Sequence, residues 1–153
     1  MRSRFDEQLA LLNRELIEMG ALCEEVIALS AQALTEGNAE LAARVAPLDQ
    51  EIDRKEREIE SLCLKLLLQQ QPVAKDLRRI SAALKMITDM ERIGDQTSDI
   101  AEIILSSKGV AATDEIHVIG TMASEVSKMV RTSVTAYVEK DLELARSVMK
   151  ADD

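Results

Sequence analysis

The chain has 153 residues, of which 46% are apolar, enough for the core of about one domain. It contains one Phe, one Tyr and no Trp, whereas β-rich folds draw heavily on aromatic residues, so we expect an all-α protein. Its formal net charge is -9, which disfavours nucleic-acid binding, because that binding depends largely on Lys and Arg neutralising phosphates.

Apolar residues recur at alternating steps of three and four from Phe5 to Ala33. This spacing predicts a first helix over residues 4–36. Gly37 and Asn38 follow it. Glycine readily takes the left-handed conformation that ends many helices, and asparagine is a preferred helix cap, so the first helix should stop here and a second should begin.

The same periodicity predicts a second helix over about 39–70, bent at Pro47 because proline removes one backbone hydrogen bond and crowds the preceding turn. Pro72 suits the first turn of a third helix, which ends near Ser106. Three long helices joined by tight turns must lie antiparallel. Residues 1–106 are therefore predicted to form an antiparallel three-helix bundle.

A linker over 106–114 precedes a fourth predicted helix at about 114–138. An offset of 103 residues then aligns the start of the chain with its end without a gap, and the break at Gly37-Asn38 recurs at Lys140-Asp141. We interpret this as an internal repeat. The predicted domains are a first bundle at 1–110 and the first helices of a second bundle at 111–153.

If the repeat is real, the chain stops inside its second copy, and we expect it to be a fragment of a longer protein. Helices over 114–153 would then expose an apolar stripe unless a partner covers it. We therefore expect oligomerisation through this stripe, most simply as a homodimer.

Cys23 and Cys63 lie in apolar helical contexts without CxxC spacing, which favours buried free thiols over a disulfide. The charged N-terminus does not resemble a signal peptide. No uncharged apolar run reaches the roughly 18 residues of a transmembrane helix. The sequence favours a cytoplasmic protein that reaches a membrane only through its partners.

Carboxylates stand out on two of the predicted helices. Glu91, Asp95 and Asp99 are spaced four apart on the third helix, as are Asp49 and Asp53 on the second. In an antiparallel hairpin that turns near residue 71, the numbers of two residues that face each other across the hairpin add up to about 142. This arithmetic places the two groups opposite each other, within roughly half a turn, so four or five carboxylates should converge on one groove.

Like charges this close destabilise a fold unless protons or cations neutralise them. Iron, manganese, magnesium, calcium and zinc all accept oxygen ligands and are candidates for the groove. The alternative is a solvated acidic face with Lys and Arg partners, for which Arg54, Lys55, Arg57 and Arg92 are near enough. Gly94 favours the metal interpretation, because a glycine inside a helix costs up to about 1 kcal/mol and suggests close approach by a neighbour.

The sequence offers little for catalysis. A di-iron site of the ferritin type needs two Glu-x-x-His motifs, but His117 is the only histidine. A Ser-His-Asp triad is not indicated either, because no pairing of a nucleophile with a base suggests itself. The five glycines are isolated, which argues against glycine-rich phosphate loops. We expect no enzyme.

Two segments resemble the phosphate-uptake regulator family, PhoU. The first is QQPVAKDLRRISAALKMITDMERIGDQTSDIAE (70–102), whose Pro-x-x-x-Asp-Leu-Arg opening and Glu-Arg-x-Gly-Asp centre look like that family's signature. The second is VAPLDQEIDRKEREIE (45–60), which resembles its second-helix motif. The internal repeat is similar to the two-bundle architecture of the family, although most of the second copy's later half is missing here.

The resemblance implies polynuclear iron or zinc clusters held by Glu/Asp-x-x-x-Asp motifs, which Asp49/Asp53, Glu91/Asp95 and Asp95/Asp99 match. It also implies a negative regulator of the phosphate regulon. Such proteins couple the ATPase subunit of the phosphate ABC transporter to a phosphate-sensing histidine kinase, without an established catalytic step. The alternative function is a helical scaffold whose acidic face binds no metal.

Overall fold

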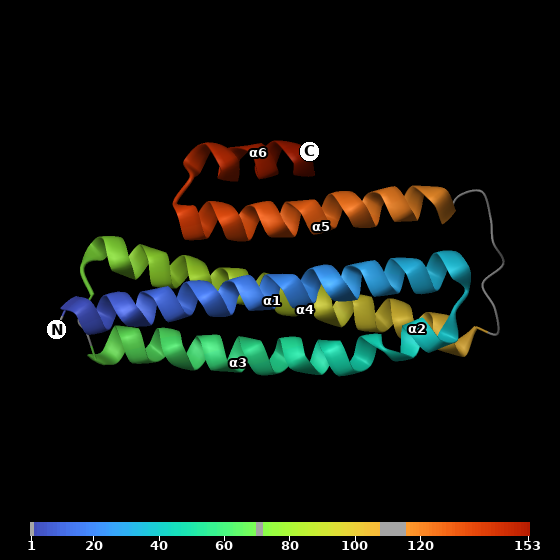
Figure 1. Ribbon diagram of the computed structural model, residues 1–153, viewed down its shortest axis with the longest axis horizontal. Coiled ribbons are helices and arrows are strands. Elements are labelled where there is room, and N and C mark those ends of the chain that lie inside the picture. The colour runs from blue at the N-terminus through green and yellow to red at the C-terminus, as the bar shows by residue number, and fades with distance from the viewer. Residues whose placement is uncertain (1, 70–71, 108–115) are drawn as a thin grey trace.

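The computed structural model describes residues 2–69, 72–107 and 116–153, and within these ranges every regular element is an α-helix. The predicted all-α class is therefore confirmed. Three long helices form the body of the molecule: α1 (Arg2–Glu36), α3 (Val45–Gln69) and α4 (Ala74–Ser106). Each packs against the other two, with α3 antiparallel to α1 and α4, as Figure 1 shows. This is the predicted antiparallel three-helix bundle.

The core lies on the shared axis of these helices and follows the predicted apolar seams. Among its fully buried large side chains are Leu12, Leu16, Ile52, Ile59 and Ile80. Burial of each such side chain stabilises the fold by roughly 1.5–3 kcal/mol. The long apolar stripes of the sequence thus account for the bundle.

Lys55 occupies a seam position on α3, and its side chain is only 14% exposed. Its ammonium donates to Glu15 at 2.6 Å and also to Glu18, both on α1. Burial alone would lower the pKa of Lys55, but the hydrogen bonds that its ammonium donates to the two carboxylates, and their charges, reverse the effect and raise it. A charged residue is therefore accommodated in the seam by ion pairs that join α3 to α1.

The predicted single bent helix over 39–70 is wrong in one respect. The chain forms a short α2 (Ala39–Ala43) and a separate α3, with the break at Arg44 rather than at Pro47. Pro47 lies in the first turn of α3, where the missing N–H breaks no helical hydrogen bond. The first turn of α3 therefore accommodates Pro47, which does not bend the middle of a helix.

Two further helices, α5 (Ile116–Glu139) and α6 (Leu142–Asp152), lie outside the bundle. α5 runs antiparallel to α1 along its length, and α6 turns back over α5 at the edge of the molecule (Figure 1). Gly20 permits the close approach, since a Cβ there would lie 3.1 Å from Val134 Cγ2. An exposed ion pair between Arg131 and Glu24 also joins the two helices.

The turn after α1 recurs after α5. Gly37 and Lys140 both have positive φ, 62° and 56°. In each turn the next residue donates its N–H back to an alanine carbonyl, Asn38 to Ala33 and Asp141 to Ala136, both at 2.9 Å. This is the Schellman end of a helix. Two turns 103 residues apart thus share conformation and hydrogen bonds, which supports the internal repeat.

The predicted linker and the domain boundary between residues 110 and 111 fall almost entirely outside the described residues, so both stay predictions. Cys23 and Cys63 are buried free thiols, as predicted. Burial raises their pKa values to about 12 and about 11. Among the described helices, none combines the length and apolar character needed to cross a membrane.

Candidate metal centre

The acidic groove between α3 and α4 is defined here by Asp49, Asp53 and Asp95. One carboxylate oxygen from each of the three lies within 4.8 Å of the other two. Asp49 and Asp53 are half-buried on successive turns of α3, and Asp95 is exposed on α4. The hairpin arithmetic therefore predicted this juxtaposition of sequence-distant carboxylates correctly.

Gly94 makes the groove possible. A Cβ at this position would lie 2.5 Å from Asp49 Oδ1 and 3.3 Å from Ile52 Cδ1. The absent side chain thus leaves room for the Asp49 carboxylate to lie against the backbone of α4. The close approach expected from a glycine inside a helix is present, and the approaching group is a carboxylate of the site itself.

The groove is electrostatically unfavourable for bare carboxylates. Burial, followed by the charges of Asp53, Asp95 and Asp99, raises the pKa of Asp49 to about 6. Burial and Asp95 also raise the pKa of Asp53, against a lowering contribution from Arg57. Moreover, Asp49 Oδ1 and Asp53 Oδ1 are buried and have no hydrogen-bond partner among the described residues. Buried polar atoms normally have one.

Glu91 and Asp99 lie beside the three aspartates but are not part of the close set. A hydrogen bond with Asp95, assisted by burial and the charges of Asp95, Glu56 and Asp53, raises the pKa of Glu91 to about 7. Asp99 contributes through its charge on Asp49. The five predicted residues therefore share one field, with Asp49, Asp53 and Asp95 at its centre.

Glu56 belongs to the same field, and the sequence prediction did not include it. Burial and the charges of Glu60, Asp53 and Asp95 raise its pKa. The signal was available, because Glu56 follows Asp53 by three residues and so lies on the same face of the helix. The prediction was limited to the pairs that hairpin geometry places opposite each other, and Glu56 lies on the next turn of the helix.

The chemistry of this donor set fits a cation. Carboxylate oxygens are the ligands of iron, manganese, magnesium and calcium, and zinc also accepts them. A cation in the groove would be coordinated by the two buried Asp oxygens that have no hydrogen-bond partner among the described residues, and it would offset the repulsion that raises the carboxyl pKa values. Thus Asp49, Asp53 and Asp95 could act as direct ligands, with Glu91, Asp99 and Glu56 at the margin.

Comparison with known proteins places this groove in a family context. The family model described as the PhoU domain matches residues 16–104, more than half of the chain. The chain belongs to the PhoU family. All six carboxylates of the groove and its margin lie inside the matched segment, whereas His117 lies outside it, exposed on α5.

Relatives of this PhoU-family chain match it over nearly its whole length. A phosphate-specific transport system accessory protein PhoU homolog of Clostridium acetobutylicum is 37% identical over 153 residues, which are 99% of this chain and 70% of that protein. The homolog of the same description in Synechocystis sp. is 36% identical, covering 99% of this chain and 68% of the relative.

The fold of this PhoU-family chain also matches a solved structure. The crystal structure of PhoU from Pseudomonas aeruginosa superposes with a TM-score of 0.89 at 32% sequence identity, covering 97% of this chain and 71% of that one. The match includes the bundle and the α5–α6 pair, since so little of this chain is left out. The resemblance to the PhoU family is thereby confirmed for both sequence and fold.

Proposed function

We propose that this chain is an accessory protein of phosphate uptake that acts by protein contacts and by binding metal in its acidic groove. Two observations support the proposal. Its relatives carry the description of accessory proteins of the phosphate-specific transport system. The groove combines three converging carboxylates with two buried oxygens that lack partners among the described residues, and this second observation carries the metal part of the proposal.

The proposed ligands are Asp49, Asp53 and Asp95, with Glu91 and Asp99 able to join a second ion or a bridging position. The ion is iron or zinc, with manganese and magnesium as further candidates. Its chemical contribution is positive charge, which neutralises the groove and holds α3 to α4. The chain's own residues hold the ion and present the surface around it, and no catalytic step is proposed.

The regulatory role is proposed to be negative. In phosphate-replete cells the chain would dock on the ATPase subunit of the phosphate ABC transporter and on a phosphate-sensing histidine kinase, in the cytoplasm, and repress the starvation response. Val118 and Met122, both 59% exposed on α5, offer apolar surface for self-association as a homodimer. Nucleic acid is not a proposed partner, given the net charge of -9.

A reporter strain tests the regulatory role. The chain is expressed in a bacterium that lacks its own PhoU-family gene and carries a reporter under a phosphate-starvation promoter. In high phosphate, the wild-type chain should lower reporter output, and the variant Asp49→Asn/Asp95→Asn should not. Glu25→Gln, an exposed charge change on α1, is the matched control and should behave as wild type. Unchanged output with the wild-type chain would refute the regulatory proposal.

Metal analysis separates the metal-binding adaptor from a plain helical scaffold. Protein purified without an affinity tag should retain at least one iron or zinc ion per chain by mass spectrometry of the elements. Asp49→Asn/Asp53→Asn/Asp95→Asn should lose it while keeping the helical circular dichroism of the wild type. A metal-free wild-type protein that also takes up no added iron or zinc would favour the scaffold.

A further inference from the structure

The end of the bundle at which α3 leads into α4 carries exposed apolar side chains. Among the exposed large apolar side chains of the described residues, Leu68 has the highest exposed fraction, 82%. Three others lie near it in the sequence, with exposed fractions between 45% and 58%. We call this surface the hairpin tip, and it consists of Leu64, Leu68, Val73 and Leu77. Apolar side chains that gather on a surface indicate an interaction site, whereas scattered ones do not.

The tip lies on the same side of the hairpin as the acidic groove. Leu64 follows Asp53 by 11 residues, about three helical turns, and therefore lies on the same face of α3. Leu77 precedes Asp95 by 18 residues, about five turns, and lies on the same face of α4. Since Asp53 and Asp95 converge on one side of the hairpin, Leu64 and Leu77 share that side. The other two residues of the tip lie one turn further along each helix.

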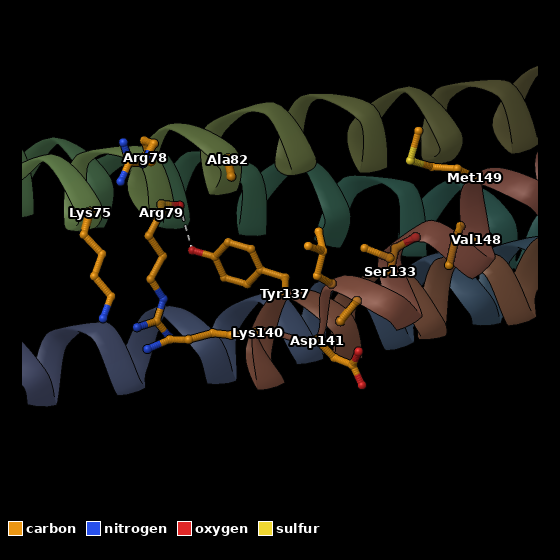
Figure 2. A pocket seen from close by; sticks show the side chains of 13 residues that line it. Lys75, Arg78, Arg79, Ala82, Ser133, Tyr137, Lys140, Asp141, Val148 and Met149 are labelled. Atoms are coloured by element: carbon orange, nitrogen blue, oxygen red, sulfur yellow. Dashed lines mark hydrogen bonds between the residues drawn. The ribbon is translucent and has the colours of Figure 1, made fainter.

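The side of α4 that faces α5 and α6 is a different one. There Arg79, Ala82 and Tyr137 line a cavity of about 760 Å³ (Figure 2), which none of the four tip residues borders. The hairpin itself consists of α3 and α4, which pack on each other and on α1. The tip side chains are therefore exposed whatever covers α5 and α6.

Cations surround the tip, although the chain as a whole is acidic. Between Ser61 and Arg79 the sequence has four cations and a single carboxylate, that of Asp76, so this stretch has a net charge of +3 in a chain of -9. Asp76 is only 5% exposed, so its carboxylate contributes little to the surface. Three of the cations are exposed and form no ion pair with another described residue: Lys65, Lys75 and Arg78.

Carboxylates elsewhere do not cancel this positive charge. The first two turns of α1, which begin at the same end of the molecule (Figure 1), hold two arginines and two carboxylates. On α3 the nearest exposed carboxylate is Glu60, one turn before Leu64. Asp53, the closest member of the acidic groove on α3, lies about 16 Å from Leu64 along the helix. That distance exceeds the screening length of about 8 Å at physiological salt, so the groove adds little to the potential at the tip.

An anionic lipid bilayer fits this combination of features. Exposed apolar side chains enter the boundary between headgroups and acyl chains, while Lys and Arg side chains beside them remain at the lipid phosphates. Each cation near an anionic bilayer adds to the attraction. The tip lies at one end of the elongated molecule, where it can meet a flat surface (Figure 1). A second copy of this chain fits less well, because two tips in contact would bring the same unpaired cations together.

We propose that the hairpin tip binds the surface of an anionic lipid bilayer directly. The four apolar side chains of the tip lie at the headgroup boundary, and Lys65, Lys75 and Arg78 contact the lipid phosphates. The inference goes beyond the proposed function, which places protein partners but no lipid in contact with the chain. It does not depend on metal in the acidic groove.

Co-sedimentation of the full chain with lipid vesicles tests the proposal. The chain should bind vesicles made of equal parts of phosphatidylglycerol and phosphatidylcholine, and added salt should weaken this binding. Binding to vesicles of phosphatidylcholine alone should be at least about tenfold weaker, because the attraction of the cations is then lost. Absence of binding to the anionic vesicles overturns the proposal. If Leu64→Glu/Leu68→Glu then still abolished reporter repression, the tip would be a docking site for an acidic protein instead.

A pair of double variants tests the apolar part of the tip. Leu64→Glu/Leu68→Glu should weaken binding to the anionic vesicles at least about tenfold. Val118→Glu/Met122→Glu is the matched control, because these two residues are also exposed and one turn apart but lie on α5. It adds the same charge and should leave binding within about twofold of wild type. Circular dichroism should show both variants folded, since all four side chains are exposed. Equal weakening by the two variants would overturn the proposal.

A pair of triple variants tests the cations. The first removes the three exposed cations of the tip and should weaken binding and flatten its dependence on salt: Lys65→Gln/Lys75→Gln/Arg78→Gln. The second removes three exposed cations of α5 and α6 and should do neither: Lys128→Gln/Arg146→Gln/Lys150→Gln. Because the two variants have the same net charge, equal weakening would show that the attraction does not come from the tip, which overturns the proposal.

Fluorescence shows which surface meets the bilayer. The chain contains no Trp, so a single Trp introduced at the tip reports on its own surroundings. The emission of Leu68→Trp should shift to shorter wavelength when anionic vesicles are added, and that of Val118→Trp should not. An unshifted Leu68→Trp spectrum on vesicles that bind the chain would place another surface against the bilayer and overturn the proposal. Metal content and reporter output are separate measurements, so failure here leaves the proposed function to stand or fall by its own tests.

Discussion

At the scale of single residues, Gly94 links the fold to the acidic groove. A Cβ at this position would meet Asp49 Oδ1 at 2.5 Å, so Gly94→Ala must displace the carboxylate. We expect metal affinity to fall at least tenfold, because a ligand held by a short side chain cannot move without losing its position. Isothermal titration with zinc or manganese measures this change.

Gly120→Ala provides the control for that substitution. Gly120 also lies inside a helix, but a Cβ there would meet nothing within 4 Å. The substitution Gly120→Ala should raise the free energy of unfolding by about 1 kcal/mol, the usual advantage of alanine over glycine in a helix. It should leave metal affinity unchanged. If Gly94→Ala stabilised the chain as much as Gly120→Ala does and bound metal normally, the groove would not depend on the missing side chain.

The raised carboxyl pKa values give a pH dependence of known sign. The pKa of Asp49 is raised from 3.8 to about 6, and that of Glu91 from 4.5 to about 7. Between the two values of each group the folded state holds more protons than the unfolded state, so stability falls as pH rises through this window. In the presence of a chelator, the free energy of unfolding attributable to these groups should therefore be higher at pH 5 than at pH 7.5.

The variant Asp49→Asn/Glu91→Gln isolates this contribution. It should be more stable than wild type at pH 7.5 by about 1 kcal/mol, a modest value because solvent screens part of the repulsion, and the two proteins should converge near pH 4. Urea unfolding of both proteins at both pH values gives the difference in stability between variant and wild type. Effects of pH on other titrating groups are common to the two proteins and cancel in this difference. A variant that is less stable than wild type at pH 7.5 would show that the carboxylates are not in mutual repulsion.

At the scale of helices, the two equivalent turns differ in their left-handed residue. Gly37 adopts φ 62° without a side chain, whereas Lys140 adopts φ 56° with one. Lys140→Gly should therefore stabilise the α5–α6 turn by about 1 kcal/mol, and Gly37→Ala should destabilise the α1–α2 turn by a similar amount. Amide hydrogen exchange of α6 should slow in the first variant. Unchanged exchange there would mean that the turn does not limit the opening of α6.

The same helices show how far the sequence determines the structure. The apolar seam from Phe5 to Ala33 and the turn at Gly37 predict α1 closely, because periodicity and turn residues act locally. The break at Arg44 was missed because Pro47 was interpreted as a bend inside one helix, whereas it lies in the first turn of a new helix. The convergence of Asp49 with Asp95 was predictable from hairpin geometry alone. The depth of Asp49 against Gly94 was not, since it depends on the rotation of one helix against the other.

At the scale of the whole molecule, the helices do not contribute equally to one cooperative unit. α1, α3 and α4 each pack against at least two long neighbours and carry most of the buried core. Among the described helices, α5 has its backbone close to α1 but not to α3 or α4, and α6 has its backbone close to α5 alone. Segments with few buried contacts open at lower free energy than the core. We expect amide exchange to be fastest in α6, intermediate in α5 and slowest in the bundle.

Binding of metal should preserve this order of amide exchange rates and widen the difference between the slowest and the fastest helices. A cation held by Asp49, Asp53 and Asp95 stabilises only those states in which α3 and α4 are together, by an amount that grows with its concentration relative to its dissociation constant. Exchange in α3 and α4 around the groove should therefore slow on adding metal, while α6, which can open without separating α3 from α4, should exchange at its metal-free rate. Hydrogen exchange with mass spectrometry, with and without a chelator, measures both. Equal protection of α6 and α4 by metal would mean that the molecule opens as one unit, and that the groove and the α5–α6 pair are coupled through the bundle.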